Sequence, residues 1–425
     1  MAQSEVKQAS SRVVPQPEPG LTVETLIERA IALRPLLREQ QDETEKRGHY
    51  SKEIDERLRD GGFYRMLQPR RFGGYELAFT DFIRVVMEIA RGDPGSAWCF
   101  TLSASHALLV GSHWSEAAQA ELFGPTGDFN SPHRAVPSGR FERVEGGYIV
   151  NGTWSYSSGI PISTHFIGAG FLRPENGPPQ PLNFIVSVDK IEILQDWGGG
   201  VALGMQGSGS NSVKLTDVFV PERHVIFGGP SGPDIIGDAG SEGVRLHGNP
   251  MYLGQLGGAY QNTFTAILTG AARAAIDEYE EIIRTKTVMM APHLLRMNDP
   301  ESQRPLGKAL ALADIAEVAA IAIADKFMDQ CKAWGEDRRP ITPADTFQLW
   351  SMSQEACFLA CEAVDLLWRT APVSAANRGS RLQRYFRDIQ MYRIHPSAQP
   401  WVSLTRGQVH LGLPFGVFGL PPFPS

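Results

Sequence analysis

The run Gly147-Tyr-Ile-Val-Asn-Gly-Thr-Trp-Ser-Tyr-Ser-Ser-Gly159 is the most informative stretch of this chain, because aromatic rings alternate with small hydroxyls in it. Glu145-Gly146-Gly147 is a turn that leads into Tyr148-Ile-Val150, and Asn151-Gly152 is a strong two-residue turn signal. The sequence therefore predicts a tight hairpin and a strand that continues from Trp154 to Ser158. Alternate residues of a strand face opposite sides, which would put Ser155 and Ser157 on one face and the large rings on the other. A row of donors beside flat rings suits a flat, polar, aromatic cofactor, although an ordinary half-buried strand shows the same pattern.

Composition places the chain among ordinary globular proteins. It has 425 residues, of which 42% are hydrophobic and 20% charged, enough for two or three domains or one large multilayer unit. The formal net charge of -7, with no long basic run, argues against nucleic acid as the main partner. No apolar run reaches the ~18 residues of a membrane-spanning helix.

The cysteines indicate neither a metal site nor a disulfide framework. Cys99, Cys331, Cys357 and Cys361 form no CxxC pair, and no cysteine–histidine cluster has the spacing of a zinc site. Cys357 and Cys361 are one helical turn apart, as packing residues would be. We therefore expect a protein without a metal, in a reducing cytoplasm.

The N-terminal third of the chain reads as a tail and a helical domain. Residues 1–20 are polar and Pro-rich and predict a disordered tail rather than a targeting peptide. Residues 21–127 predict helices, and Thr22 is the expected cap of the first one. A strongly apolar helix is expected over residues 97–110, capped by Asp93-Pro-Gly-Ser96, and it must be deeply buried.

The rest of the chain reads as a β domain followed by a bundle. Short strands separated by Gly/Pro turns in residues 128–249 predict an antiparallel β-barrel or sandwich with a trailing loop, and long loops usually act as lids or binding segments. Residues 250–412 predict a four-helix bundle, and residues 413–425 a Pro-rich tail. The four helices are expected at residues 260–286, 307–334, 342–371 and 380–409. The fold class is therefore mostly α with a central β domain.

A helical part, a small β domain and a final bundle, in that order, resemble the acyl-CoA dehydrogenase fold over about residues 22–409. Several segments also resemble the family in sequence. They are Gly270-Ala-Ala-Arg-Ala-Ala-Ile-Asp277 in the bundle, and Asp196-Trp197, Gly204-Met-Gln-Gly-Ser-Gly-Ser210 and Asp217-Val-Phe-Val-Pro-Glu222 in the middle domain. Tyr156-Ser157-Ser158-Gly159 falls where the family carries the strand that lies against the flavin.

The chain departs from the dehydrogenases at their catalytic base. They carry a glutamate near a Gly-rich C-terminal motif, whereas residues 403–419 contain no carboxylate to abstract an α-proton. Two other segments are similar to the oxygenase components of two-component flavin monooxygenases, of the 4-hydroxyphenylacetate hydroxylase and secosteroid phenol hydroxylase type. These segments are Gly95-Ser-Ala-Trp98 with His106 on the helix after it, and Arg387-Asp-Ile-Gln-Met-Tyr-Arg-Ile-His395.

This resemblance implies an enzyme that binds reduced flavin, FMNH2 or FADH2, and O2. A C4a-hydroperoxyflavin would form in a dry pocket between the β domain and the bundle and would hydroxylate an aromatic, phenolic substrate at the ortho position. No GxGxxG motif opens a strand-to-helix turn, so a separate NAD(P)H-dependent flavin reductase would supply the cofactor. The family usually forms a homotetramer through the bundle, and we expect the same here.

Three other functions stay open at this point. Dibenzothiophene monooxygenase shares a similar histidine pair, which leaves oxygen transfer to sulfur or nitrogen as one alternative. An acyl-CoA dehydrogenase with FAD and a displaced base is the second, and a flavin-binding protein without catalysis is the third. Anaerobic addition of acyl-CoA separates the second from the rest, because only a dehydrogenase would bleach its oxidised flavin.

The resemblance assigns catalytic roles to three residues. His106 would hydrogen-bond the substrate hydroxyl and favour the phenolate, because a phenol with a pKa near ~10 is a weak nucleophile until its proton is shared. His395 would face the oxygen-reactive edge of the flavin, with Asp388 on the same helix face. Ser157 would bind near flavin N5. Without the resemblance, His106 would be a satisfied core histidine and His395 a capped or solvated residue before Pro396.

Further candidates rest on weaker matches. Ser158 is a second candidate for the cofactor, Trp98 covers the flavin or fills the core, and Ser131 contacts the substrate or belongs to a turn. Three basic residues match loosely the position that binds the cofactor phosphates of a neighbouring subunit, or are solvated: Arg284, Lys286 and Arg296. The remaining histidines form no recognisable constellation: His49, His113, His133, His165, His224, His247, His293 and His410.

Overall fold

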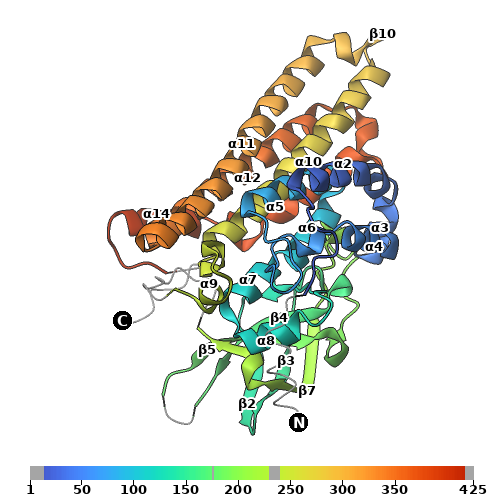
Figure 1. The fold of residues 1–425 in the computed structure, drawn as a ribbon. Helices are drawn as coiled ribbons and strands as arrows, with labels where there is room; N and C mark the ends of the chain where they lie inside the picture. The colour runs from blue at the N-terminus through green and yellow to red at the C-terminus, as the bar shows by residue number, and fades with distance from the viewer. Residues whose placement is uncertain (1–13, 175–176, 229–239, 417–425) are drawn as a thin grey trace.

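The computed structural model describes residues 14–174, 177–228 and 240–416. In Figure 1 the C-terminal helices lie at the top, the N-terminal helices against them, and the β-sheets at the bottom. One large hydrophobic core runs through both helical parts, and a smaller one fills the β part. The predicted order of a helical part, a β domain and a helical bundle is confirmed.

The N-terminal part is helical, as predicted. Its helices are α2 (Val23–Glu39), α3 (Gln41–Arg47), α4 (Lys52–Asp60), α5 (Phe79–Gly92), α6 (Pro94–Ala104), α7 (His106–His113) and α8 (Glu116–Leu122). Thr22 caps α2, because its side chain accepts a hydrogen bond from the Thr25 amide at 3.3 Å. Asp93 caps α6 by accepting from the Ser96 amide at 2.8 Å.

The apolar helix expected over residues 97–110 is in fact two helices, α6 and α7, interrupted at Ser105. The Leu102 carbonyl, which a regular helix would pair with the amide four residues later, lies 2.8 Å from Nδ1 of the His106 ring. Two residues later, the Leu108 amide bonds the Ser105 carbonyl at 3.1 Å, in a tighter turn of three residues. The expected deep burial is confirmed for both helices, and the interruption holds the His106 ring against the backbone.

The β part consists of two four-stranded sheets packed as a sandwich, and the described residues form no closed barrel. One sheet has the order β1 (His133–Arg134), β4 (His165–Leu172), β5 (Gln180–Ser187) and β8 (Val225–Phe227). The other has the order β2 (Arg140–Val144), β3 (Gly147–Trp154), β7 (Val213–Pro221) and β6 (Glu192–Ile193). Strand β1 runs parallel to β4, and the other pairs are antiparallel.

The hairpin prediction at Asn151-Gly152 is wrong. The turn expected at Glu145-Gly146-Gly147 is present, because Val144 and Gly147 pair across β2 and β3, whereas Asn151 and Gly152 stand inside β3. The Asn151 side chain is engaged with Asp217 of β7 instead, accepting from its amide at 2.9 Å and donating to its carboxylate at 3.0 Å. Asp217 has a left-handed φ of 50° at a bulge of the β3–β7 ladder, so the turn-forming chemistry serves a bulge.

The prediction that the strand continues to Ser158 with its rings on one face is also wrong. Strand β3 ends at Trp154, and Tyr156 has a left-handed φ of 61°. Trp154 is buried in the core between the sheets, whereas Tyr156 is 65% exposed. The change of backbone direction breaks the two-residue alternation that the pattern assumed.

The C-terminal part is a helical bundle. Its elements are the helices α10 (Gly257–Thr285), α11 (Pro300–Asp337), α12 (Pro343–Thr370), α13 (Arg381–Arg393) and α14 (Trp401–His410), and the small hairpin of β9 (Thr287–Val288) and β10 (Ala291–Leu295). The fourth expected helix, over residues 380–409, is divided into α13 and α14. Pro396 explains the division, because proline offers no amide hydrogen and disfavours a helical residue before it. A short 3-10 turn, η9 (Pro396–Ala398), follows the break.

The predicted tails and trailing loop fall partly outside the described residues, which omit residues 1–13, 229–239 and 417–425. Residues 14–20 of the predicted disordered tail make defined contacts, and the Val14 amide bonds the Arg71 carbonyl at 3.0 Å. Within the predicted loop stands a short helix, α9 (Glu242–His247), followed by the 3-10 turn η6 (Pro250–Leu253). Across the described ranges, no helix is long and apolar enough to cross a membrane.

Candidate functional site

His106 is buried and held in one tautomer. Its Nδ1 atom lies 2.8 Å from the Leu102 carbonyl oxygen and 2.9 Å from that of Ser131. Because carbonyls only accept hydrogen bonds, Nδ1 must carry the ring proton, and Nε2 is left as an acceptor. Burial lowers the pKa of His106 to about 4, so the ring is neutral at pH 7. Ser131 thus contributes its backbone, while its hydroxyl donates to the Pro132 carbonyl at 2.9 Å.

His133, which had no recognisable partner in the sequence, lies beside His106. Their ring centroids are 5.5 Å apart and the rings are nearly perpendicular. Nε2 of His133 lies 2.9 Å from Oδ1 of Asn183, whose own amide nitrogen donates to the Gly228 carbonyl at 3.1 Å. Burial, together with the neighbouring His106, lowers the pKa of His133 to about 3. This contact depends on the pairing of β1 with β4 and of β4 with β5, which no local pattern reveals.

Tyr260 on α10 is the third ring at this end of the site. Its centroid is 5.2 Å from that of His106. The hydroxyl is buried near the backbone of Leu109 without a hydrogen bond of normal geometry to any described residue. Burial raises the pKa of Tyr260 well above its usual value, so the hydroxyl keeps its proton.

The His395 ring packs against α10 one helical turn beyond Tyr260. Its ring centroid is 4.8 Å from that of Phe264, four residues after Tyr260, and 5.7 Å from that of Trp98. Nδ1 accepts a hydrogen bond from the Ser397 amide at 3.2 Å, so in the neutral ring the proton sits on Nε2. Burial and the nearby Arg134 lower the pKa of His395 to about 4. The structure therefore brings both predicted histidines to one stretch of α10.

Asp388 lies on α13, the helix that ends just before His395, but its carboxylate binds another part of the chain. Its carboxylate accepts a hydrogen bond from the Met205 amide at 2.6 Å. Burial, together with the nearby carboxylates of Asp93 and Glu45, raises the pKa of Asp388 to about 7. Asp388 fastens the middle-domain loop to α13.

A row of hydroxyls connects α6 with the end of β3. The Trp98 indole N–H donates to the Ser158 hydroxyl at 3.2 Å, and Ser158 and Ser210 exchange a hydrogen bond at 2.7 Å. Ser208 continues the row at 2.7 Å from Ser210. Ser157 is separate from this row, because its hydroxyl donates to the Trp154 carbonyl at 3.2 Å.

Comparison with known proteins places these residues in a family. Models of the acyl-CoA dehydrogenase N-terminal and C-terminal domains match residues 29–125 and 262–400, which together exceed half of the chain. The chain is 26% identical over 410 residues to the flavin-dependent monooxygenase oxygenase subunit HsaA of Rhodococcus jostii, covering 93% of this chain and 98% of that protein. It is 25% identical over 380 residues to the oxygenase component of p-hydroxyphenylacetate 3-hydroxylase of Acinetobacter baumannii, covering 89% and 86%.

The solved structures agree. The 3-HSA hydroxylase from Rhodococcus sp. RHA1 superposes with a TM-score of 0.81 at 25% identity, covering 93% of this chain and 99% of that one. The chain belongs to the flavin-dependent monooxygenases of the acyl-CoA dehydrogenase fold. XiaF from Streptomyces sp., whose structure contains FADH2, has the same fold, with a TM-score of 0.82 at 20% identity and coverage of 100% and 99%.

The surroundings of Tyr156 in this monooxygenase fit a flavin. Tyr156 is a largely exposed ring that meets Trp197 edge-on, with centroids 6.1 Å apart, beside the row of serine hydroxyls. Its left-handed backbone is of the kind that concentrates at functional sites. The side chain of the half-buried Arg134 makes no hydrogen bond or ion pair with any residue in the described ranges, so its charge is free for an anionic group. Hydroxyls, flat rings and an uncompensated cation together suit a polar aromatic cofactor.

The three basic candidates for the cofactor phosphates lie elsewhere in the subunit. They stand near the β9–β10 end of the bundle, away from the β-sheets (Figure 1). Arg284 pairs with Glu280 on the helix surface, and Arg296 donates to the Thr370 carbonyl at 2.8 Å. Lys286 is exposed at the end of α10. None of them joins the histidine site within one chain, so a role in the cofactor site would need a second subunit.

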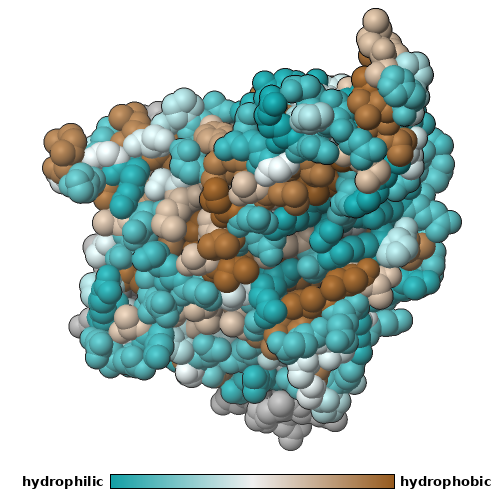
Figure 2. Space-filling view, turned by 90° about the horizontal axis from the view of Figure 1, so that it is seen from above, coloured by the Kyte–Doolittle hydropathy of each residue, from teal (hydrophilic) through white to brown (hydrophobic). Residues whose placement is uncertain are grey.

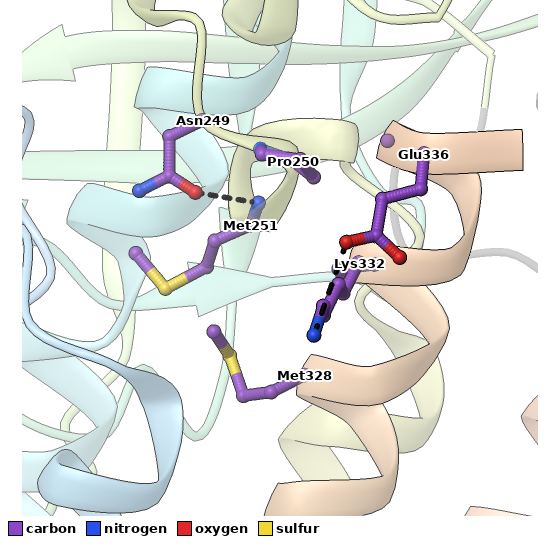
Figure 3. A pocket seen from close by; sticks show the side chains of 8 residues that line it. Asn249, Pro250, Met251, Met328, Lys332 and Glu336 are labelled. Carbon is purple, nitrogen blue, oxygen red and sulfur yellow. Dashed lines mark hydrogen bonds and ion pairs between the residues drawn. The ribbon is translucent and has the colours of Figure 1, made fainter. Parts of the chain in front are cut away.

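A separate cavity of about 290 Å³ lies between η6 and α11 (Figure 3). Met251, Met328 and Cys331 form its apolar lining, and Lys332 and Glu336, one turn apart on α11, pair at 3.8 Å beside it. No residue predicted for the catalytic site lines this cavity. The predicted histidines therefore lie outside this cavity.

Proposed function

We propose that this protein is the oxygenase component of a two-component system, which uses reduced flavin and O2 to hydroxylate a phenolic substrate. The observation that carries the proposal is the placement of His106 and His395 against one stretch of α10, each neutral and each held in a single tautomer. The relatives named as oxygenase components of hydroxylases support the same reading.

His106 is proposed to orient and polarise the substrate. Its free Nε2 would accept the hydrogen bond of the substrate hydroxyl, which shifts electron density from the O–H bond toward the aromatic ring. With a pKa near 4, His106 is too weakly basic to hold the proton at pH 7. It therefore acts as a fixed acceptor rather than a strong base.

His395 is proposed to serve the oxygen side of the reaction. A bound reduced flavin, FMNH2 or FADH2, supplies the electrons that activate O2. The free Nε2–H of His395 is a donor, in contrast to the acceptor of His106, and would hold a proton where oxygen reacts. The apolar rings of Trp98 and Phe264 beside it exclude water from this end.

Ser157 and Ser158 are proposed to hold the flavin ring near N5. Ser157 gives its proton to the Trp154 carbonyl, so its oxygen can only accept, which suits the N5–H of a reduced flavin. Ser158 already receives the Trp98 indole proton. In anaerobic fluorescence titrations, we expect Ser157→Ala to weaken the binding of reduced flavin more than the binding of oxidised flavin. Ser158→Ala should weaken the binding of both equally. Equal effects of the two variants would contradict the assignment of N5 to Ser157.

The protein is further proposed to be a homotetramer supplied by a separate NAD(P)H-dependent flavin reductase. Hydrophobic side chains gather in stripes on the upper face of the molecule (Figure 2). Exposed apolar residues on α11 include Leu310, Ile315 and Val318. Arg284, Lys286 and Arg296 would then reach the phosphates of a neighbouring subunit's flavin. A cytoplasmic location also stays a prediction.

Single-turnover chemistry tests the proposed reaction. Flavin reduced without a reductase is bound to the protein anaerobically, mixed with O2 and a phenol, and the products are identified by mass spectrometry. We expect one 18O atom from 18O2 in the ring product of the wild type, and at least about a hundredfold less product from His106→Leu. Hydroxylation that needs no protein, or a thiophene sulfoxide formed in preference to any phenol product, would contradict the proposal.

A further inference from the structure

His133 offers a hydrogen-bond acceptor that the proposed reaction does not use. Asn183 binds its Nε2–H at 2.9 Å, which leaves Nδ1 without a proton and without a partner among the described residues. The ring centroid of His133 lies 5.5 Å from that of His106, and the Tyr260 ring, whose hydroxyl makes no hydrogen bond of normal geometry with any described residue, lies 5.2 Å from His106. Two acceptors and one hydroxyl are thus carried by His106 and the two rings that contact it.

A single phenolic hydroxyl cannot satisfy both imidazoles. It has one proton, and once Nε2 of His106 accepts that proton, the phenol oxygen can only accept. The Tyr260 hydroxyl can donate to that oxygen, but Nδ1 of His133 cannot. A buried acceptor left without a donor destabilises the complex, so a ligand with a second donor binds better than one without.

We propose that His133 is a second substrate-binding residue, and that the site selects aromatic substrates with two hydrogen-bond donors, one ring hydroxyl for His106 and a second hydroxyl or N–H for His133. This inference rests on the proposed function, since it specifies the substrate class of the same site. It assigns a role to a residue that lies outside the predicted histidine pair.

Asn183 is the positioning residue in this arrangement. Its amide nitrogen donates to the Gly228 carbonyl at 3.1 Å, which turns its carbonyl oxygen toward His133. As long as that oxygen accepts from Nε2–H, Nδ1 of His133 stays an acceptor. Asn183→Leu removes the constraint and allows the other tautomer, in which Nδ1 is a donor. Asn183→Asp keeps an oxygen acceptor at the same place and preserves the tautomer.

Three probe ligands of similar size test the inference: phenol, 3-methoxyphenol and resorcinol. Only resorcinol has a second donor, and 3-methoxyphenol fills the same space without one. Binding to the flavin-loaded protein is measured anaerobically by calorimetry. We expect the wild type to bind resorcinol about tenfold more tightly than 3-methoxyphenol, the size of one added hydrogen bond. His133→Phe should reduce that ratio to about one, Asn183→Leu should lower it, and Asn183→Asp should retain it.

His165 provides the matched control. It is another neutral histidine of the same sheet, stacked on Phe129 at 5.1 Å, and it makes no ring contact with His106. His165→Phe should leave the resorcinol preference unchanged. The inference would be overturned if the preference for resorcinol persisted in His133→Phe. It would also be overturned if the wild type hydroxylated phenol and 3-methoxyphenol but showed no such preference. Both outcomes leave the proposed function intact. Failure to hydroxylate any phenol would overturn both.

Discussion

His395 and His106 differ in which ring nitrogen is left free. The Leu102 and Ser131 carbonyls take the Nδ1 proton of His106, so an acceptor remains, whereas the Ser397 amide occupies Nδ1 of His395, so a donor remains. Both rings are neutral near pH 7, because burial lowers both pKa values to about 4. At the residue scale, the backbone around each histidine decides which one accepts a proton from the substrate and which one holds a proton for oxygen.

A substitution that keeps the cap tests the donor role of His395. Asn is a good N-cap residue, so His395→Asn should retain a side-chain acceptor for the Ser397 amide of η9 while it removes the ring N–H. We expect unchanged thermal unfolding and unchanged flavin affinity, but about a hundredfold less hydroxylated product per flavin oxidised, with hydrogen peroxide in its place. Product is measured by chromatography and peroxide by a coupled assay in single turnovers. Product formation equal to the wild type would refute the role.

The loop from Gly204 to Ser210 is joined to helix α13 by a close backbone approach and a hydrogen bond. A side chain at Gly204 would come within van der Waals overlap of the Arg387 carbonyl, so only glycine allows this approach. The next amide, that of Met205, is bound by Asp388. This contact couples the middle-domain segment that carries Ser208 and Ser210 to the helix that leads to His395. At the scale of elements, the cofactor side and the histidine side of the site depend on the same junction.

Two substitutions of Asp388 separate its hydrogen bond from its charge. Asp388→Ala leaves the buried Met205 amide unpaired and should lower the free energy of unfolding by about 1–3 kcal/mol. Asp388→Asn keeps an acceptor and should not destabilise. The pKa of Asp388 is raised to about 7 in the folded chain, so its contribution to the free energy of unfolding falls as pH rises from about 4 to 7. The stability of Asp388→Asn relative to the wild type should therefore be greatest above pH 7. Urea unfolding at pH 6 and pH 8 checks both, and equal losses in the two variants would contradict the hydrogen-bond argument.

Local signals predict elements well where the local chain decides them. Thr22 and Asp93 cap helices as their side chains suggest, and Pro396 marks a break that the helical pattern alone overlooks. Asn151-Gly152 misleads because a partner 66 residues away, Asp217, recruits the Asn151 side chain to a bulge. His106 and His395 are found from resemblance to a family, whereas the place of His133 depends on a sheet pairing with no local sign.

Neutral histidines that are buried or half-buried occur in all three parts of the molecule. Those with strongly lowered pKa values are His106, His133, His165, His247 and His395. Burial is the largest cause for every one of them. The folded chain therefore disfavours protonation of all these rings, whether they serve the proposed reaction or only the packing. At the scale of the whole molecule, the fold should be sensitive to acid.

Acid should destabilise the protein in a defined pH window. A histidine in the unfolded chain has a pKa near ~6.5, whereas these rings titrate at about 3 to 4 when folded, so between pH 4 and 6.5 the unfolded state binds protons that the folded state does not. The stability is fully present above about pH 6.5 and is lost as pH falls toward 4. His165→Phe removes one such group while it keeps a ring against Phe129. Its free energy of unfolding, measured with urea from pH 7 to pH 5, should therefore fall less steeply than that of the wild type, by up to about 1.4 kcal/mol per pH unit. Parallel pH curves for the two proteins would show that His165 is protonated equally in both states.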